Sequence, residues 1–113
     1  MEQPIIYHNP RCSKSRTCLN LLIEKGFKPR VIEYIKNPLN VEELESLSKY
    51  FELADVVRTN EKAFKSLNVS LDNKHQVLQA IVHEPKLLQR PIVIYNQRAI
   101  IARPPEKVVL LFN

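Results

Sequence analysis

The sequence predicts an α/β protein with one mixed four-stranded sheet flanked by helices. Three observations lead to this prediction. Two short apolar runs flank an amphipathic segment near the start of the chain, residues 40–84 have only helical patterns, and two further apolar runs then flank a two-residue turn. A helical crossover favours parallel pairing of the first two strands, and a two-residue turn favours antiparallel pairing of the last two.

The first half of the predicted sheet is a βαβ unit. Residues 4–7 form a short apolar run, predicted as a strand that is buried on both faces. Residues 13–25 have the spacing of an amphipathic helix, and Gly26 follows where a left-handed cap is expected. The apolar positions of this helix are Cys18, Leu19, Leu22 and Ile23. Residues 30–35 then form the second predicted strand.

A helical insertion is predicted at about residues 40–84. Asn40 is followed three residues later by Glu43, which is a variant of the capping box that begins a helix. Shorter helical patterns follow at residues 53–57, 61–66 and 72–83. In this segment Arg58 ends a short apolar pair and would by default be a solvated surface residue.

The second half of the predicted sheet is a ββα unit. Residues 91–95 and 98–102 flank Asn96-Gln97, a possible hairpin turn that lacks the usual glycine. A final helix is predicted to start at residues 103–106, because prolines are tolerated in a first helical turn. The order βαβ, helices, ββα is that of an interrupted thioredoxin-like fold, and residues 1–113 are expected to form a single domain.

Composition excludes several classes of function. The chain has 113 residues, of which 44% are hydrophobic, enough for one core. Its 17 basic and 12 acidic residues give a net charge of +5, but the basic residues are spread along the chain, so no nucleic-acid partner is predicted. Gly26 is the only glycine, which excludes Gly-rich phosphate loops and dinucleotide fingerprints. No metal or bound cofactor is predicted.

The two cysteines, Cys12 and Cys18, indicate a reducing environment. They are too few to staple a secreted scaffold, and six helical residues would separate them by about 9 Å along the axis, too far for a disulfide. Neither an apolar leader nor a run long enough to span a bilayer is present. A cytoplasmic location without membrane contact is therefore expected, with Cys18 as a core residue.

Cys12 is the candidate nucleophile, because it lies where a strand gives way to a helix. The first-turn N–H groups and the positive end of the helix dipole would stabilise a thiolate. The basic residues Arg11, Lys14 and Arg16 would add charge, and the Ser15 hydroxyl could donate to sulfur from one turn away. The alternative is a small buried residue at a helix start, which would not call for basic neighbours.

Four segments together resemble a known family: residues 8–16, Arg58, residues 90–93 and residues 103–108. They are similar to the glutaredoxin-linked bacterial arsenate reductases, and most similar to a small arsenate-reductase-like branch with Cys-Ser-Lys-Ser-Arg. Pro91 resembles the cis proline that thioredoxin-like proteins place opposite the active cysteine, the alternative being an edge-strand proline.

The resemblance implies a thiol-dependent reduction of arsenate to arsenite. In that family a cysteine attacks arsenate, glutathione as co-substrate displaces oxide, and glutaredoxin reduces the mixed intermediate. Guanidinium groups suit the step because they bind tetrahedral dianions in pairs of hydrogen bonds and neutralise their charge. The implied roles are the nucleophile for Cys12, oxyanion binding for Arg58, Arg90 and Arg103, and tuning of the thiol for His8 and Ser15. Two roles stay open for His8, which could be a cationic partner of the thiol or could merely hydrogen-bond within the loop.

Two alternatives stay open at this stage. One is a redox regulator of the same fold that binds RNA polymerase, but such regulators carry Cys-x-x-Cys, and Ser15 stands at the second position here. The other is a general thiol oxidoreductase that acts on glutathione or protein disulfides. Disulfide exchange needs no tetrahedral-anion site, so the three arginines favour arsenate.

Overall fold

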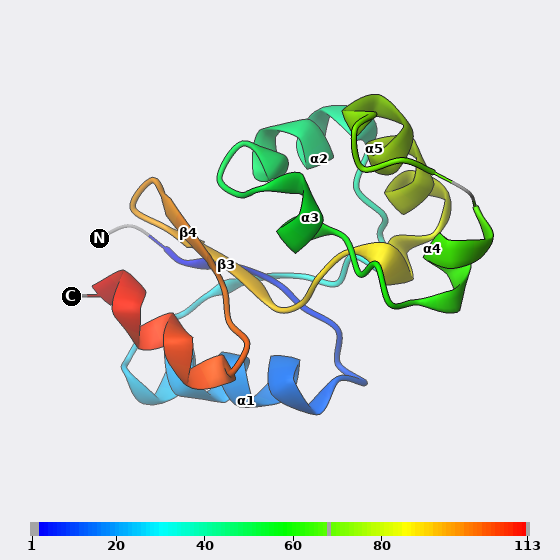
Figure 1. Ribbon diagram of the computed structural model, residues 1–113. Helices are drawn as coiled ribbons and strands as arrows, with labels where there is room; N and C mark the ends of the chain where they lie inside the picture. Colours follow the sequence, from blue (N-terminus) through cyan, green and yellow to red (C-terminus); the bar gives the residue numbers. More distant parts are fainter. Residues whose placement is uncertain (1–2, 68, 113) are drawn as a thin grey trace. The chain divides into compact units, whose positions relative to one another are not determined.

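The computed structural model describes residues 3–67 and 69–112 (Figure 1). The chain divides into two compact units, one of Met1–Asn37 with Arg90–Asn113 and one of Pro38–Gln89. The second unit corresponds to the predicted insertion at 40–84, with slightly wider bounds. Each unit is described separately below.

The first unit contains the predicted mixed sheet. Its strands are β1 (Ile5–Tyr7), β2 (Arg30–Ile32), β3 (Ile92–Tyr95) and β4 (Arg98–Ile101). The strand order is β2-β1-β3-β4, with β1 parallel to β2 and antiparallel to β3, and with β3 antiparallel to β4. The parallel first pair and the antiparallel hairpin are therefore both confirmed.

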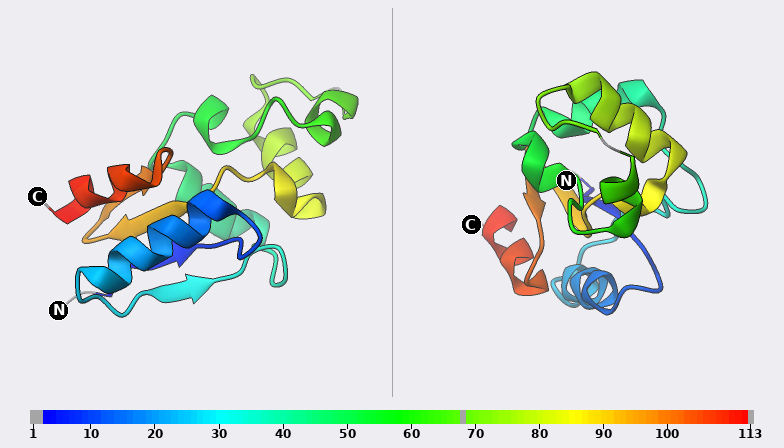
Figure 2. Two further views of the ribbon diagram at one scale, coloured as in Figure 1. Left: turned by 90° about the horizontal axis from the view of Figure 1, so that it is seen from below. Right: turned by 45° about the vertical axis from the view of Figure 1, so that its right-hand side comes forward.

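Two helices cover one face of this sheet. The helices α1 (Ser13–Glu24) and η2 (Pro105–Phe112) lie side by side on that face, as Figures 1 and 2 show. η2 is a 3₁₀ helix rather than an α-helix. The core between the helices and the sheet is formed by Ile6, Cys18, Leu22, Val93, Ala102, Val108 and Leu111.

The first two strands are shorter and more exposed than predicted. β2 ends at Ile32 instead of residue 35, because the main-chain N–H groups of Lys36 and Asn37 turn back to the carbonyl of Glu33. β2 is also an edge strand. In β1 only Ile6 is fully buried, so the prediction of burial on both faces was wrong.

The predicted ends of α1 and of the hairpin are confirmed. Gly26 has φ +90°, in the left-handed region, just after the C-terminus of α1. Asn96 and Gln97 have φ of 53° and 62°, so they form the tight turn between β3 and β4 although neither is glycine. By contrast, Ile23 is 54% exposed and does not belong to the core side of α1.

The second unit is helical, as predicted. It contains α2 (Val41–Ser48), α3 (Leu53–Val56), α4 (Lys62–Ser66), α5 (Lys74–His83) and η1 (Pro85–Leu87). Asn40 and Glu43 form the predicted capping box at the start of α2, with both hydrogen bonds present. An antiparallel bridge between Val57 and Leu88 joins the segment after α3 to the segment after η1. No helix in the described residues is both long and apolar enough to cross a membrane.

Candidate active site

The candidate site lies at one end of the sheet in the first unit. In the strand register, Tyr7 at the end of β1 is opposite Ile92 at the start of β3, and Ile92 is opposite Ile101 at the end of β4. The segments that carry Cys12, Arg90 and Arg103 all leave the sheet at this end. The antiparallel pairing thus brings together residues far apart in the sequence.

Cys12 is the residue immediately before α1, as its sequence position predicts. It has an extended backbone with φ −93° and ψ 120°, its own N–H donates to the carbonyl of Asn9, and its carbonyl accepts from Arg16. Partial burial acts to raise the pKa of Cys12. The main-chain N–H groups of Ser15 and Lys14 and the guanidinium of Arg90 outweigh this effect and lower the pKa below its usual value.

The cation that lowers the pKa of Cys12 is therefore distant in sequence. Arg90 acts on the thiol both through a hydrogen bond and through its charge. The predicted first-turn N–H donors do act on the thiol, but the predicted basic side chains do not: Arg11 and Lys14 have exposed side chains, and the Arg16 guanidinium donates to the carbonyl of Pro10 at 2.8 Å. The sequence around Cys12 contains no residue that indicates this role of Arg90.

Ser15 and His8 form a buried pair beneath the cysteine loop. The Ser15 hydroxyl lies 2.6 Å from His8 Nδ1 and accepts a hydrogen bond from the main-chain N–H of Asn9 at 3.1 Å. The predicted hydroxyl donation to sulfur is thus replaced: it is the main-chain N–H of Ser15 that acts on Cys12, while the hydroxyl holds the loop. No side-chain pattern in the sequence distinguishes these two arrangements.

The surroundings of the His8 imidazole disfavour its cationic form. Burial lowers the pKa of His8, the carboxylate of Glu33 acts to raise it, and the charge of Arg16 lowers it further, with a net lowering. A cationic His8 beside the thiol was one of two roles open from the sequence. The structure favours the other role, in which His8 hydrogen-bonds within the loop.

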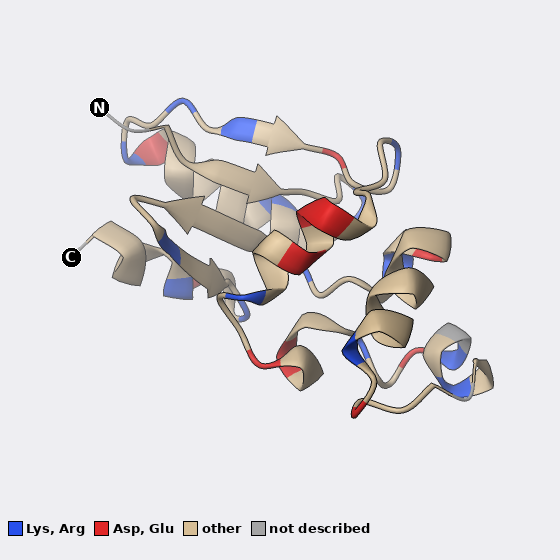
Figure 3. Ribbon diagram, turned by 90° about the horizontal axis from the view of Figure 1, so that it is seen from above, with Lys and Arg blue, Asp and Glu red and all other residues tan. Residues whose placement is uncertain are grey.

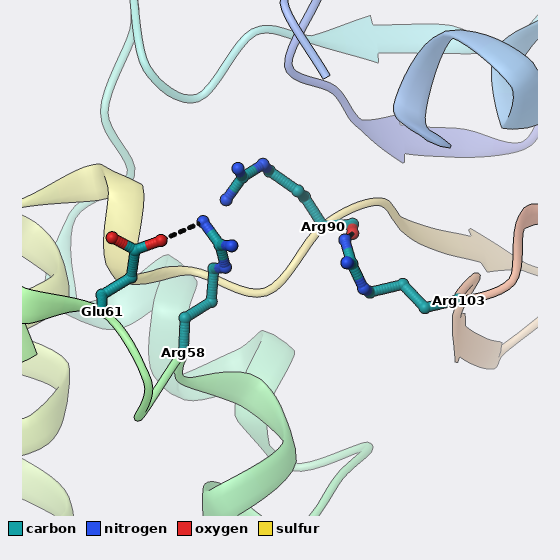
Figure 4. Close-up of polar contacts among 4 residues, drawn as sticks. All are labelled: Arg58, Glu61, Arg90 and Arg103. Carbon is teal, nitrogen blue, oxygen red and sulfur yellow. Dashed lines mark hydrogen bonds and ion pairs between the residues drawn. The ribbon is translucent and has the colours of Figure 1, made fainter. Parts of the chain in front are cut away.

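Arg103 contacts Arg90 directly. Its Nη1 donates to the main-chain carbonyl of Arg90 at 3.0 Å (Figure 4). The Nε of Arg90 is buried and makes no hydrogen bond within the described residues. Both Arg90–Pro91 and Arg103–Pro104 are cis peptide bonds, so the predicted cis proline is observed together with a second that the sequence analysis did not anticipate.

Arg58 belongs to the second unit. Its guanidinium forms an ion pair with the carboxylate of Glu61 at 2.6 Å (Figure 4), and its main-chain N–H donates to the carbonyl of Leu87. Arg58 is therefore a paired, partly buried arginine rather than a freely solvated one. Its participation in the oxyanion site stays a prediction.

The other titratable side chains in the described part of the chain do not form a second candidate centre. Lys and Arg residues are distributed over helices, strands and loops of both units, as Figure 3 shows. Among the described residues, no group of three His, Cys, Asp or Glu side chains gathers where it could hold a metal ion. His75 and His83, both on α5, have exposed side chains.

Comparison with known proteins gives consistent results. The model of the ArsC family matches residues 7–110. Haemophilus influenzae arsenate reductase is 44% identical over 110 residues, covering 93% of this chain and 95% of that protein. Uncharacterized protein YfgD of Escherichia coli is 43% identical, covering 96% of this chain and 95% of that one. The solved structure of an arsenate reductase from Vibrio cholerae has a TM-score of 0.88 and 38% identity, covering 97% of this chain and 98% of that chain.

Proposed function

The chain belongs to the ArsC family, and we propose on this premise that it reduces arsenate to arsenite with Cys12 as the nucleophile. The observation that carries the proposal is the pairing of a partly exposed thiol of lowered pKa with the guanidinium of Arg90. A thiolate alone would suit disulfide exchange. A thiolate beside an arginine with a buried, unpartnered Nε suits attack on a bound oxyanion.

The reaction begins with binding of arsenate, a tetrahedral dianion at neutral pH. Arg90 and Arg103 neutralise the charge that would otherwise repel the thiolate, and we assign the same role to Arg58 because the family resemblance implies it. The sulfur of Cys12 then bonds to arsenic, and an oxygen leaves as water after protonation. The first-turn N–H groups stabilise the free thiolate, and part of this stabilisation is lost when the sulfur attacks arsenic. A moderate rather than extreme lowering of the pKa of Cys12 therefore favours reactivity.

Reduction of arsenic(V) to arsenic(III) needs two electrons from outside the chain. We assign them to thiols: glutathione displaces a second oxygen from the adduct, and glutaredoxin attacks the glutathione sulfur. Glutaredoxin and glutathione leave as a mixed disulfide, the electron pair stays on arsenic, and water releases arsenite from Cys12. These two thiol partners suit the reducing, cytoplasmic location that we propose for the protein.

One assay tests this function. The purified protein is mixed with glutathione, glutaredoxin and its NADPH-dependent reducing system, and NADPH consumption is followed as arsenate is added. We expect consumption that saturates with arsenate and disappears in Cys12→Ser. If the protein, with glutaredoxin and arsenate both left out, instead drives NADPH consumption equally with a small glutathione disulfide substrate, it would be a general thiol oxidoreductase, and the proposed function would be wrong.

A further inference from the structure

We propose that Arg103 is a positioning residue, which holds Arg90 against Cys12 through its contact with the Arg90 carbonyl. This role is distinct from any contact of Arg103 with substrate. The inference rests on the proposed function only in naming the site's purpose, because the contact itself joins two residues of this chain.

The main chain of Arg90 lies just outside the sheet. β3 begins at Ile92, and the hydrogen bonding between the hairpin strands ends with the N–H of Ala102 donating to the carbonyl of Pro91 at 2.9 Å. Beyond this point, the only hydrogen bond to the Arg90 main chain within the described residues comes from Arg103 Nη1, at 3.0 Å. The Arg103 side chain therefore holds the main chain of Arg90, just as the hydrogen bonds between β3 and β4 hold the strand residues.

The side chain of Arg90 needs such an anchor. It has four rotatable bonds, and holding it in one geometry costs conformational entropy. Its Nε is buried without a hydrogen-bond partner, so the described residues around Nε do not fix its orientation. The contact that matters chemically is made further out, where the guanidinium meets the thiol of Cys12. A shift of the Arg90 main chain would move that guanidinium directly.

The geometry allows Arg103 to perform both roles. A guanidinium has five N–H donors in a planar fork, and the carbonyl of Arg90 occupies only Nη1. Among the described residues its remaining donors have no other hydrogen-bond partner, so they can bind an oxyanion. Arg103 is not among the groups that shift the pKa of Cys12, so removing it should affect the thiol through Arg90 rather than directly.

The test measures thiol reactivity in the absence of any oxyanion. Rates of alkylation of Cys12 by iodoacetamide are recorded against pH in chloride buffer for the parent, Arg103→Gln, Arg90→Gln and the double variant, each in a Cys18→Ala background. We expect Arg103→Gln to lower the rate at pH 7 by about threefold to tenfold and to move the profile to higher pH. In the Arg90→Gln background the same substitution should change the rate by less than about twofold.

Arg98 provides the matched control. It is also an arginine of the hairpin, and its guanidinium also donates to main-chain carbonyls, those of Leu110 at 3.1 Å and Leu111 at 3.4 Å. Arg98→Gln removes comparable contacts at the far end of β4 and should leave the alkylation profile unchanged. Melting curves identify any variant that does not fold, in which case Arg103→Lys, expected to give an intermediate rate, replaces Arg103→Gln.

Two outcomes would overturn the inference. An unchanged profile in Arg103→Gln would show that the contact does not position Arg90. An equal fall in both backgrounds would show that Arg103 acts on the thiol independently of Arg90. Neither result depends on arsenate, so the inference can stand if the protein proves not to reduce arsenate, and it can fail while the enzyme activity is found.

Discussion

The N-terminal end of α1 and its middle turn differ sharply, although a cysteine lies at each. Cys12, at the start of the helix, is partly exposed and has a lowered pKa. Cys18, six residues later, is fully buried, and burial raises its pKa to about 12. At neutral pH a thiol with that pKa is ionised in roughly one molecule in 10⁵.

Burial itself does not separate the two cysteines, because it opposes ionisation at both. The difference lies in the groups that offset this effect of burial on the thiolate. Cys12 has two main-chain N–H groups and the guanidinium of Arg90, whereas Cys18 has apolar neighbours such as Ile6 and Leu22. A helix thus offers a thiol its free donors only in the first turn. Reactivity in this chain depends on position within the helix more than on residue type.

Exchanging each cysteine for serine gives the largest expected contrast. Cys12→Ser should lower the rate of arsenate reduction on the order of 10³-fold or more. Cys18→Ser should retain activity, but its free energy of unfolding should fall by about 1 to 3 kcal/mol, because a buried hydroxyl is left without a partner. Activity of the parent should be lost as pH falls through the lowered pKa of Cys12, because only the thiolate attacks. Measurements of kcat/KM against pH, with a urea titration of each variant, check both. Retention of activity in Cys12→Ser would remove the contrast.

Replacing Arg90 by lysine should remove part of the stabilisation that Cys12 has and Cys18 lacks. Lysine keeps the charge but loses the planar fork, so binding of sulfate or arsenate should weaken by about 1.5 to 3 kcal/mol, the cost of one charged hydrogen bond. Isothermal calorimetry measures this effect, and Arg98→Lys is the control in the same hairpin. If Arg90→Lys bound oxyanions as tightly as the parent, Arg90 would serve the thiol alone.

The smallest expected effect on the thiol comes from Ser15→Ala. This change removes the hydroxyl that pairs with His8 and accepts from Asn9, so the partly buried N–H of Asn9 loses its partner and stability should fall by about 1 to 3 kcal/mol. The main-chain N–H of Ser15 remains, so alkylation of Cys12 should slow less than in Arg90→Gln. Urea titration and alkylation rates measure the two effects separately. An equal slowing would show that the hydroxyl itself reaches the thiolate, as the sequence alone suggests.

Local sequence patterns determined most elements of the fold. The capping pair Asn40 and Glu43 begins α2, Gly26 follows the end of α1, and Asn96-Gln97 turns the hairpin, all at the predicted residues. Each of these signals concerns residues within one turn of each other, where backbone geometry and short-range hydrogen bonds dominate. The position of Cys12 before α1 belongs to the same class.

Only the tertiary structure decided which side chains stabilise the Cys12 thiolate. The nearby basic residues predicted as its partners have exposed side chains, while Arg90, far away in the sequence, acts on the thiol and is itself held by Arg103. Likewise, the Ser15 hydroxyl pairs with His8 instead of with sulfur. Long, flexible side chains can satisfy their hydrogen bonds in several ways, and the strand pairing that brings distant segments to one end of the sheet selects among them.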